Sequence, residues 1–77
     1  MIFFTAYANK KFLVLERHDV MIGRENIAFV VGSPDTVNDS KKPLLFAHKK
    51  LADGRTFCVV YKNEGDLKKI ITFYPLL

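Results

Sequence analysis

The chain is poor in the residues that form covalent or metal-held frameworks. Its 77 residues include one cysteine, no tryptophan, three prolines and four glycines. A single cysteine, Cys58, excludes an internal disulfide and any zinc site that is built on a pair of cysteines. Neither histidine has a second one nearby in the sequence, and Asp35 and Asp39 lack the spacing of a calcium loop. We therefore expect no metal and no cofactor.

Long apolar segments and recognisable catalytic motifs are also missing. The sequence has no run of about 18 apolar residues, which a membrane-spanning helix requires. The first residues are apolar and then basic, which is the reverse of a secretory signal peptide. No glycine-rich phosphate loop or nucleophile elbow is present. These features predict a cytoplasmic protein without a membrane segment and provide no motif for a small-molecule enzyme.

The composition is that of a small basic globular protein. Hydrophobic residues make up 49% of the chain and charged residues 26%, so residues 1–77 are expected to fold as a single domain. A chain of this size buries only about 60% of its unfolded surface, so its core is small. The net charge of +4 favours acidic partners, of which nucleic acid is the commonest. Basic charge that serves only solubility is the alternative.

The first half of the sequence predicts a short strand and two helices. Residues 2–5 are apolar and β-prone, and Thr5 can cap a helix that continues to about His18. The spacing of Ala8, Phe12 and Leu15 gives this helix one buried stripe. A second helix is indicated by the spacing of Ile27, Val30 and Val31. We expect Gly32 to adopt the left-handed conformation after this helix and Pro34 to prevent its continuation.

The second half predicts three strands after a polar loop at residues 33–43. These strands cover residues 44–51, 55–62 and 67–74, and Pro75 ends the last one. A two-residue turn at Asp53-Gly54 would pair Lys49 with Cys58 and Lys50 with Phe57. In that register, one face of the sheet carries Phe46, His48, Phe57, Val59 and Tyr61.

These elements define the expected fold class as α+β. A short N-terminal strand and two helices are followed by a three-stranded antiparallel meander. Neither face of the predicted sheet is plainly polar, and two helices can cover only one of them. The second face is therefore expected to belong to an interface or a cleft.

Several strings in the chain resemble a family of small prokaryotic domains. The strings are FTAYANKKF, ERHDVMIGRENIAFVVGSPDTV and GRTFCVVYKNEGDLKKIITFYP. That family is similar to the RelE/ParE and BrnT type of toxin, so the resemblance implies a RelE-like fold with helices on an antiparallel sheet. It also implies a domain that cleaves RNA or blocks a cellular target and is inhibited by an antitoxin. Tyr7 stands where the family usually has histidine, and Cys58 stands where a basic residue is common.

The sheet carries three candidates for catalysis of RNA cleavage. Metal-independent cleavage needs a group that takes the 2′-hydroxyl proton, one that protonates the leaving oxygen, and cations for the phosphate. His48, Tyr74 and Arg55 are of the right types for an endoribonuclease. His48 is the best acid–base candidate, because an ordinary histidine titrates near a pKa of about 6.5. The alternative is a half-buried histidine with a structural role.

Lysine pairs supply the candidate RNA-binding residues. These are Lys10, Lys11, Lys49, Lys50, Lys68 and Lys69. Together they could contact phosphates, although ordinary solvated charge is the alternative. The predicted function is a toxin-like domain that binds RNA or the ribosome, as a weakened or inactive ribonuclease. A non-catalytic protein-interaction module or homodimer is the alternative, and an antitoxin-like protein is the other expected partner.

Overall fold

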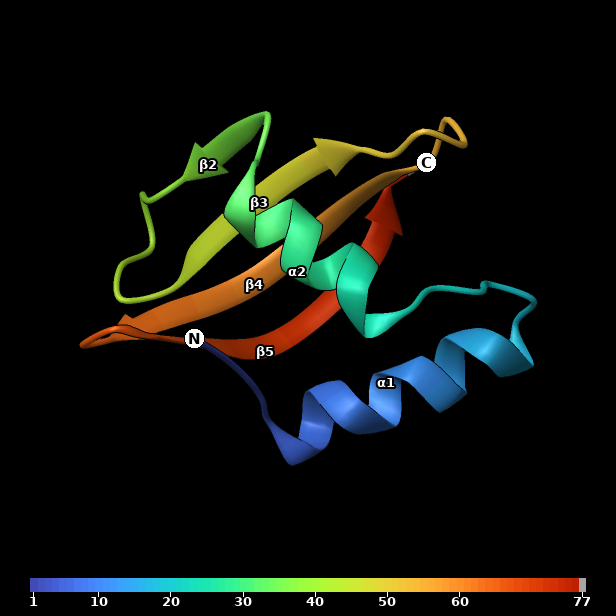
Figure 1. The fold of residues 1–77 in the computed structure, drawn as a ribbon, viewed down its shortest axis with the longest axis horizontal. Helices are drawn as coiled ribbons and strands as arrows, with labels where there is room; N and C mark the ends of the chain where they lie inside the picture. Colours follow the sequence, from blue (N-terminus) through green and yellow to red (C-terminus); the bar gives the residue numbers. More distant parts are fainter. Residues whose placement is uncertain (77) are drawn as a thin grey trace.

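The computed structural model describes residues 1–76 and forms one layer of helices on one sheet (Figure 1). The helices are α1 (Ala6–Arg17) and α2 (Arg24–Gly32). The strands are β1 (Ile2–Phe4), β2 (Thr36–Asn38), β3 (Leu45–Lys50), β4 (Thr56–Glu64) and β5 (Leu67–Leu76). They form a single five-stranded sheet in the order β1-β5-β4-β3-β2. β1 runs parallel to β5, and all other neighbours are antiparallel.

The fold class is α+β, as expected, but the sheet is larger and mixed. The three strands of the predicted meander correspond to β3, β4 and β5. In the structure, β1 pairs with one edge of this meander and β2 with the other. β1 was expected as a strand, but its parallel pairing with β5 was not predicted. β2 was predicted as loop because residues 33–43 are polar and lack apolar periodicity, and in the structure Thr36, Val37 and Asn38 are all exposed. Its pairing with β3, rather than an apolar pattern of its own, makes it a strand.

Side-chain hydrogen bonds fix the beginnings of both helices. The Thr5 hydroxyl accepts a hydrogen bond from the backbone N–H of Ala8 at 3.1 Å, as predicted for an N-cap. At the second helix, the side-chain oxygen of Asn26 accepts a hydrogen bond from the N–H of Gly23 at 3.0 Å. The prediction for Gly32 was wrong, because this residue is the last of α2 and has no positive φ. The chain leaves the helix through Ser33, so it needs no left-handed residue there.

The hairpin between β3 and β4 is present, but its predicted register was wrong by one residue. Leu51 donates its N–H to the carbonyl of Arg55 at 2.7 Å, and Gly54 donates to the carbonyl of Leu51 at 2.9 Å. The loop therefore contains three residues, with Gly54 at φ +92°. As a result, Lys49 lies opposite Phe57 and His48 lies opposite Cys58. A shift of one residue moves every β3 side chain to the other face relative to β4.

The core lies between the helices and one face of the sheet. The sheet contributes Phe57, Val59, Tyr61, Ile70 and Phe73, which are all buried. The helices contribute Ala8, Leu15, Ile27, Val30 and Val31. The predicted stripe residues Ala8, Leu15, Ile27, Val30 and Val31 are all buried. Phe12, the remaining stripe residue, is partly buried and packs its ring 4.6 Å from that of Phe73, measured between centroids.

The last strand continues past the point where the sequence predicted its end. β5 runs through Pro75 to Leu76, and Pro75 lies opposite Phe57 of β4. β1 pairs with β5 only from Lys68 to Ile70, so within residues 1–76 no strand covers the outer side of β5 beyond this point. Proline has no N–H to donate, and edge positions of this kind tolerate it.

Candidate nucleic-acid interface on the open face of the sheet

The side of the sheet that faces away from both helices is called here the open face. Cross-strand partners share a face, so the register assigns its residues. They are Phe3, Thr36, Asn38, Phe46, His48, Lys50, Thr56, Cys58, Val60, Lys62, Glu64, Leu67, Lys69, Thr72, Tyr74 and Leu76. None of them belongs to the cluster that packs under the helices. The open face is thus rich in aromatic, hydroxyl and lysine side chains.

A row of four chemically distinct residues crosses the centre of the open face. Thr36, His48, Cys58 and Tyr74 are direct partners on four neighbouring strands. Nδ1 of His48 lies 3.3 Å from the Thr36 hydroxyl, which holds the imidazole in place. Because neighbouring strands are about 4.8 Å apart, two strand spacings of roughly 10 Å separate His48 from Tyr74. The structure thus brings these two candidates to one face but not into contact.

Cys58 fills the space between His48 and Tyr74. Its side chain is completely buried although no helix covers it, because larger side chains flank it. Burial raises the pKa of the Cys58 thiol, and contact with the Tyr74 hydroxyl opposes this only in part. The same contact, together with burial, raises the pKa of Tyr74. Both groups are therefore neutral near pH 7, and the thiol is not an activated nucleophile.

Arg55 lies away from the other two catalytic candidates. Its guanidinium donates hydrogen bonds to the carboxylate of Asp53 at 2.7 Å and to the carbonyl of Met21 at 2.8 Å. It also lies 5.3 Å from the centroid of the Phe57 ring, which is on the helix side of the sheet. These contacts hold Arg55 beside the segment that joins the two helices, so it does not share a site with His48 and Tyr74.

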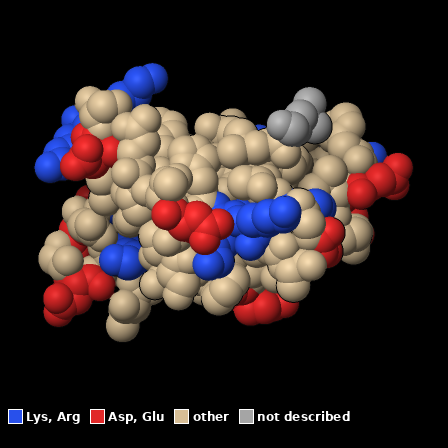
Figure 2. Space-filling model, turned by 90° about the horizontal axis from the view of Figure 1, so that it is seen from above, with Lys and Arg blue, Asp and Glu red and all other residues tan. Residues whose placement is uncertain are grey.

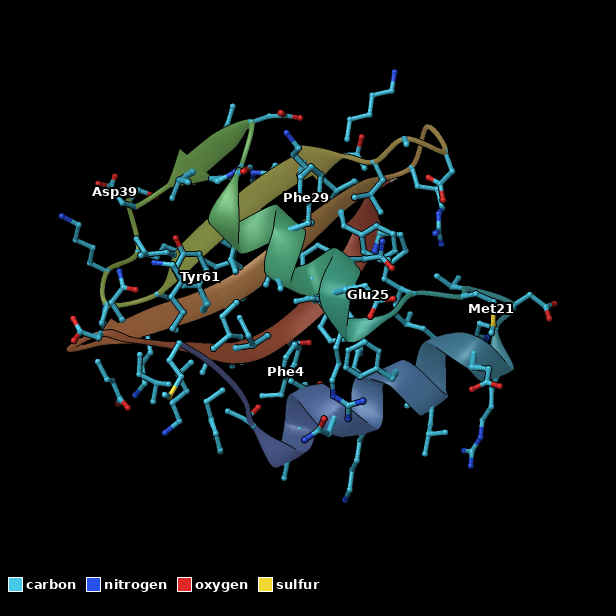
Figure 3. All side chains as sticks on the ribbon, in the orientation of Figure 1. Phe4, Met21, Glu25, Phe29, Asp39 and Tyr61 are labelled. Atoms are coloured by element: carbon cyan, nitrogen blue, oxygen red, sulfur yellow. The ribbon has the colours of Figure 1, made fainter. Side chains whose placement is uncertain are left out.

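The strand lysines divide between the two sides of the sheet. Adjacent strand residues point to opposite faces, so each pair contributes one lysine to each side. Lys50 and Lys69 belong to the open face. The ammonium of Lys49 lies 3.1 Å from Asp35 and 5.1 Å from the ring centroid of Phe29. Figure 3 shows Phe29 on the part of α2 that lies over β3, so Lys49 points to the helix side.

The remaining predicted lysines also lie away from the open face. Lys68 places its ammonium 5.8 Å from the ring centroid of Tyr61, which belongs to the helix-side core. Lys10 and Lys11 lie on α1, on the helix side of the sheet. The six predicted lysines therefore do not form one surface, because only Lys50 and Lys69 share the open face.

Two open-face cations were not among the predicted site residues. Lys62 is the direct partner of Lys69, and both lie near Glu64, at 3.3 and 3.9 Å. Lys41 lies in the loop after β2, with its ammonium 5.8 Å from the ring centroid of Phe46. The alternation of β4 could have identified Lys62 once the register was right. No sequence signal identifies Lys41, because its position depends on how the loop folds back.

Acidic side chains balance part of the positive charge. Figure 2 shows Lys and Arg side chains beside Asp and Glu side chains, with uncharged surface between them. Hydrogen bonds from the backbone N–H of Lys50 and the side chain of Lys49 lower the pKa of Asp35. The side-chain and backbone hydrogen bonds of Arg55 lower the pKa of Asp53 in the same way. These carboxylates stay ionised near pH 7 and hold Lys49 and Arg55 in place.

The loop between β2 and β3 borders two hollows. One, of about 120 Å³, is lined by Asn38, Lys41, Phe46 and His48. The other is more open, measures about 470 Å³ and is lined by Lys42, Pro43, Leu45 and Asn63. Among the described residues that line it, Lys42 is the only cation, and this lysine lies 3.7 Å from the Asp39 carboxylate. The smaller hollow thus combines more of the groups that bind an anion.

Comparisons with known proteins add no relatives. No family model, curated protein or solved structure matches the chain significantly. The resemblance to RelE/ParE and BrnT toxins is not tested by these comparisons and stays a prediction. In residues 1–76, no helix has the length and apolar character needed to cross a membrane. The same residues contain no group of three His, Cys, Asp or Glu side chains placed to hold a metal ion.

Proposed function

We propose that the protein binds single-stranded RNA on the open face of its sheet and does not cleave it. The arrangement of this face carries the proposal. His48, Phe46 and Tyr74 lie in its centre and are partly exposed, while Lys50 lies near one end. Lys62 and Lys69 lie near the other end. Sheets that bind single-stranded RNA stack bases on such rings and contact phosphates with flanking cations.

The separation of the catalytic candidates supports binding without cleavage. Cleavage requires a base, an acid and a cation around one scissile phosphate. Cys58 separates His48 from Tyr74, and the guanidinium of Arg55 is held by Asp53 and Met21 on the other side of the sheet. A toxin-like domain with this geometry would act by occupying RNA, either free or in the ribosome. Its location would be cytoplasmic, because such RNA is found there.

The adjacent lysines provide a matched experiment. The test compares the double variant Lys50→Ala/Lys69→Ala with the control Lys49→Ala/Lys68→Ala, which removes the same charge from the helix side of the sheet. Binding of a short fluorescein-labelled oligouridylate is followed by anisotropy at several salt concentrations. If Lys50, Lys62 and Lys69 each contact one phosphate, log K for the wild type falls with log salt with a slope of about −2.1.

The two double variants should differ in both affinity and salt dependence. Loss of Lys50 and Lys69 should make the slope less steep by about 1.4 and weaken binding by about 25-fold near 0.1 M salt. The Lys49/Lys68 variant should bind RNA as the wild type does. Equal weakening of both would mean that general charge, and not the open face, attracts RNA. Absence of wild-type binding at low salt would overturn the proposal.

The outer surface of α1 supports a second candidate, a protein-interaction module or homodimer. Tyr7 and Leu13 are 65% and 59% exposed, and Val14 and Met21 are exposed near them in the chain. Exposed apolar side chains that gather into one patch are typical of an interface. Sedimentation of the wild type and of Leu13→Ser tests this candidate. A concentration-dependent dimer that the substitution abolishes would support it, and a strict monomer would exclude self-association.

A further inference from the structure

The hollow at the edge of the open face contains one cation and two polar groups. Asn38 and His48 line it from β2 and β3, and Lys41 lines it from the loop that connects these strands. Phe46, the direct partner of Asn38, forms its apolar wall. Its volume of about 120 Å³ is large enough for one small polar group.

Existing contacts orient the two polar side chains. The side-chain oxygen of Asn38 accepts a hydrogen bond from the N–H of Ser40 at 2.9 Å. This contact identifies Nδ2 as the end of Asn38 that can donate to a ligand. Nδ1 of His48 lies 3.3 Å from the Thr36 hydroxyl, so Nε2 is the ring nitrogen left for a ligand.

The charge of the hollow selects an anion. No carboxylate in residues 1–76 forms an ion pair with Lys41, and no acidic residue lines the hollow. The nearest acidic residue in the sequence, Asp39, instead lies 3.7 Å from the ammonium of Lys42. One lysine beside the Asn38 amide and the His48 ring matches a phosphodiester, which carries one negative charge. Lysine binds phosphate as a compact point charge.

We propose that this hollow is a phosphate-binding site, where Lys41, Asn38 and His48 hold one phosphate group of the bound RNA. The inference rests on the proposed RNA binding and assigns one contact within it. The hollow opens beside the His48–Cys58–Tyr74 row. A strand whose phosphate occupies the hollow therefore has its neighbouring bases over the rings of the open face.

The test compares Lys41→Ala with Lys42→Ala in the full chain. The two lysines are adjacent and exposed, so both variants lose the same charge and should fold. Oligouridylate binding is measured by anisotropy. The side-chain amide of Asn38 and the ring of His48 are followed by NMR during titration with the RNA and, separately, with inorganic phosphate. Chloride at equal ionic strength is the control.

The proposal predicts a difference between the two variants. With the Lys41 contact added to the three on the strands, the wild-type slope becomes about −2.8. Lys41→Ala should bring it back to about −2.1 and weaken RNA binding by about fivefold near 0.1 M salt. Lys42→Ala should leave both unchanged, and RNA should shift the Asn38 and His48 signals. If the two substitutions had equal effects while the wild type still bound RNA, the hollow would not be a phosphate site. The proposed function would remain valid.

Inorganic phosphate separates the two possible sources of the anion. If the protein binds no RNA but phosphate shifts the Asn38 and His48 signals, and Lys41→Ala abolishes these shifts, the hollow is a site for free phosphate. The proposed function would then fail while the phosphate site stands. If neither RNA nor phosphate shifts these signals relative to chloride, the site does not exist.

Discussion

Substitution of Phe73 tests whether the helices cover only one face of the sheet. Its side chain is fully buried on the helix side, opposite Val59 and 4.6 Å from Phe12 between ring centroids. Replacement of a buried phenylalanine by alanine costs about 3–5 kcal/mol. We expect about 4 kcal/mol here, because the rigid sheet limits collapse of the cavity. Stabilities of about 0.05–0.15 kcal/mol per residue give this chain about 4–12 kcal/mol in total.

Urea unfolding of Phe73→Ala and Phe3→Ala measures the contrast between the faces. Phe3 lies on the open face and is 50% exposed, so its loss should cost less than about 1 kcal/mol. Because Phe73→Ala could leave the chain unfolded, Phe73→Leu gives a milder perturbation of about 1–1.5 kcal/mol. If Phe3→Ala cost as much as Phe73→Ala, the open face would be covered in solution and the one-sided packing would be refuted.

Two further predictions concern turns and pH. Gly54→Ala should destabilise by about 1 kcal/mol because φ is +92°, whereas Gly32→Ala should stabilise by about 0.5–1 kcal/mol because this glycine ends a helix in open space. Thermal unfolding would reveal the opposite signs, and equal signs would contradict the backbone assignments. Stability should fall as the pH rises from about 8.5, because the unfolded Cys58 thiol ionises there while burial keeps the folded one protonated. Unfolding of Cys58→Ala across this range should lack that fall; a wild-type curve that stays flat to about pH 9.5 would refute it.

The sequence predicted those elements whose own residues carry the signal. The Thr5 cap, the Leu15 and Ile27 stripes and the β3–β4 hairpin each depend on local chemistry. β2 could not be predicted, because its strand character comes entirely from its partner. The length of the hairpin loop could not be predicted either, because two-residue and three-residue loops both use a glycine with positive φ.

The candidate site was predictable only in part. The length of the β3–β4 loop determines which residues of β3 lie on the open face. His48 and Tyr74 were identified by residue type, and the structure places both on one face. Arg55 was also identified by type, but its contact with the Met21 carbonyl joins residues far apart in the chain. Lys41 belongs to the hollow through a loop conformation that no periodic pattern encodes.

Because Lys49 and Lys50 are adjacent, the two faces of the sheet respond differently to a change in the register of β3. If β3 slipped by one residue against β4, Lys49 would replace Lys50 on the open face, and the charge of that face would be preserved. The same slip would turn Ala47 and Leu51, which are buried, toward solvent. The slip would also move His48 off the open face, so selection for the correct register acts through His48 and the apolar residues, and not through the charge of the lysine pair. In evolution, the loop from Leu51 to Arg55 could change length without removing the positive charge of the open face, provided that the core adapts.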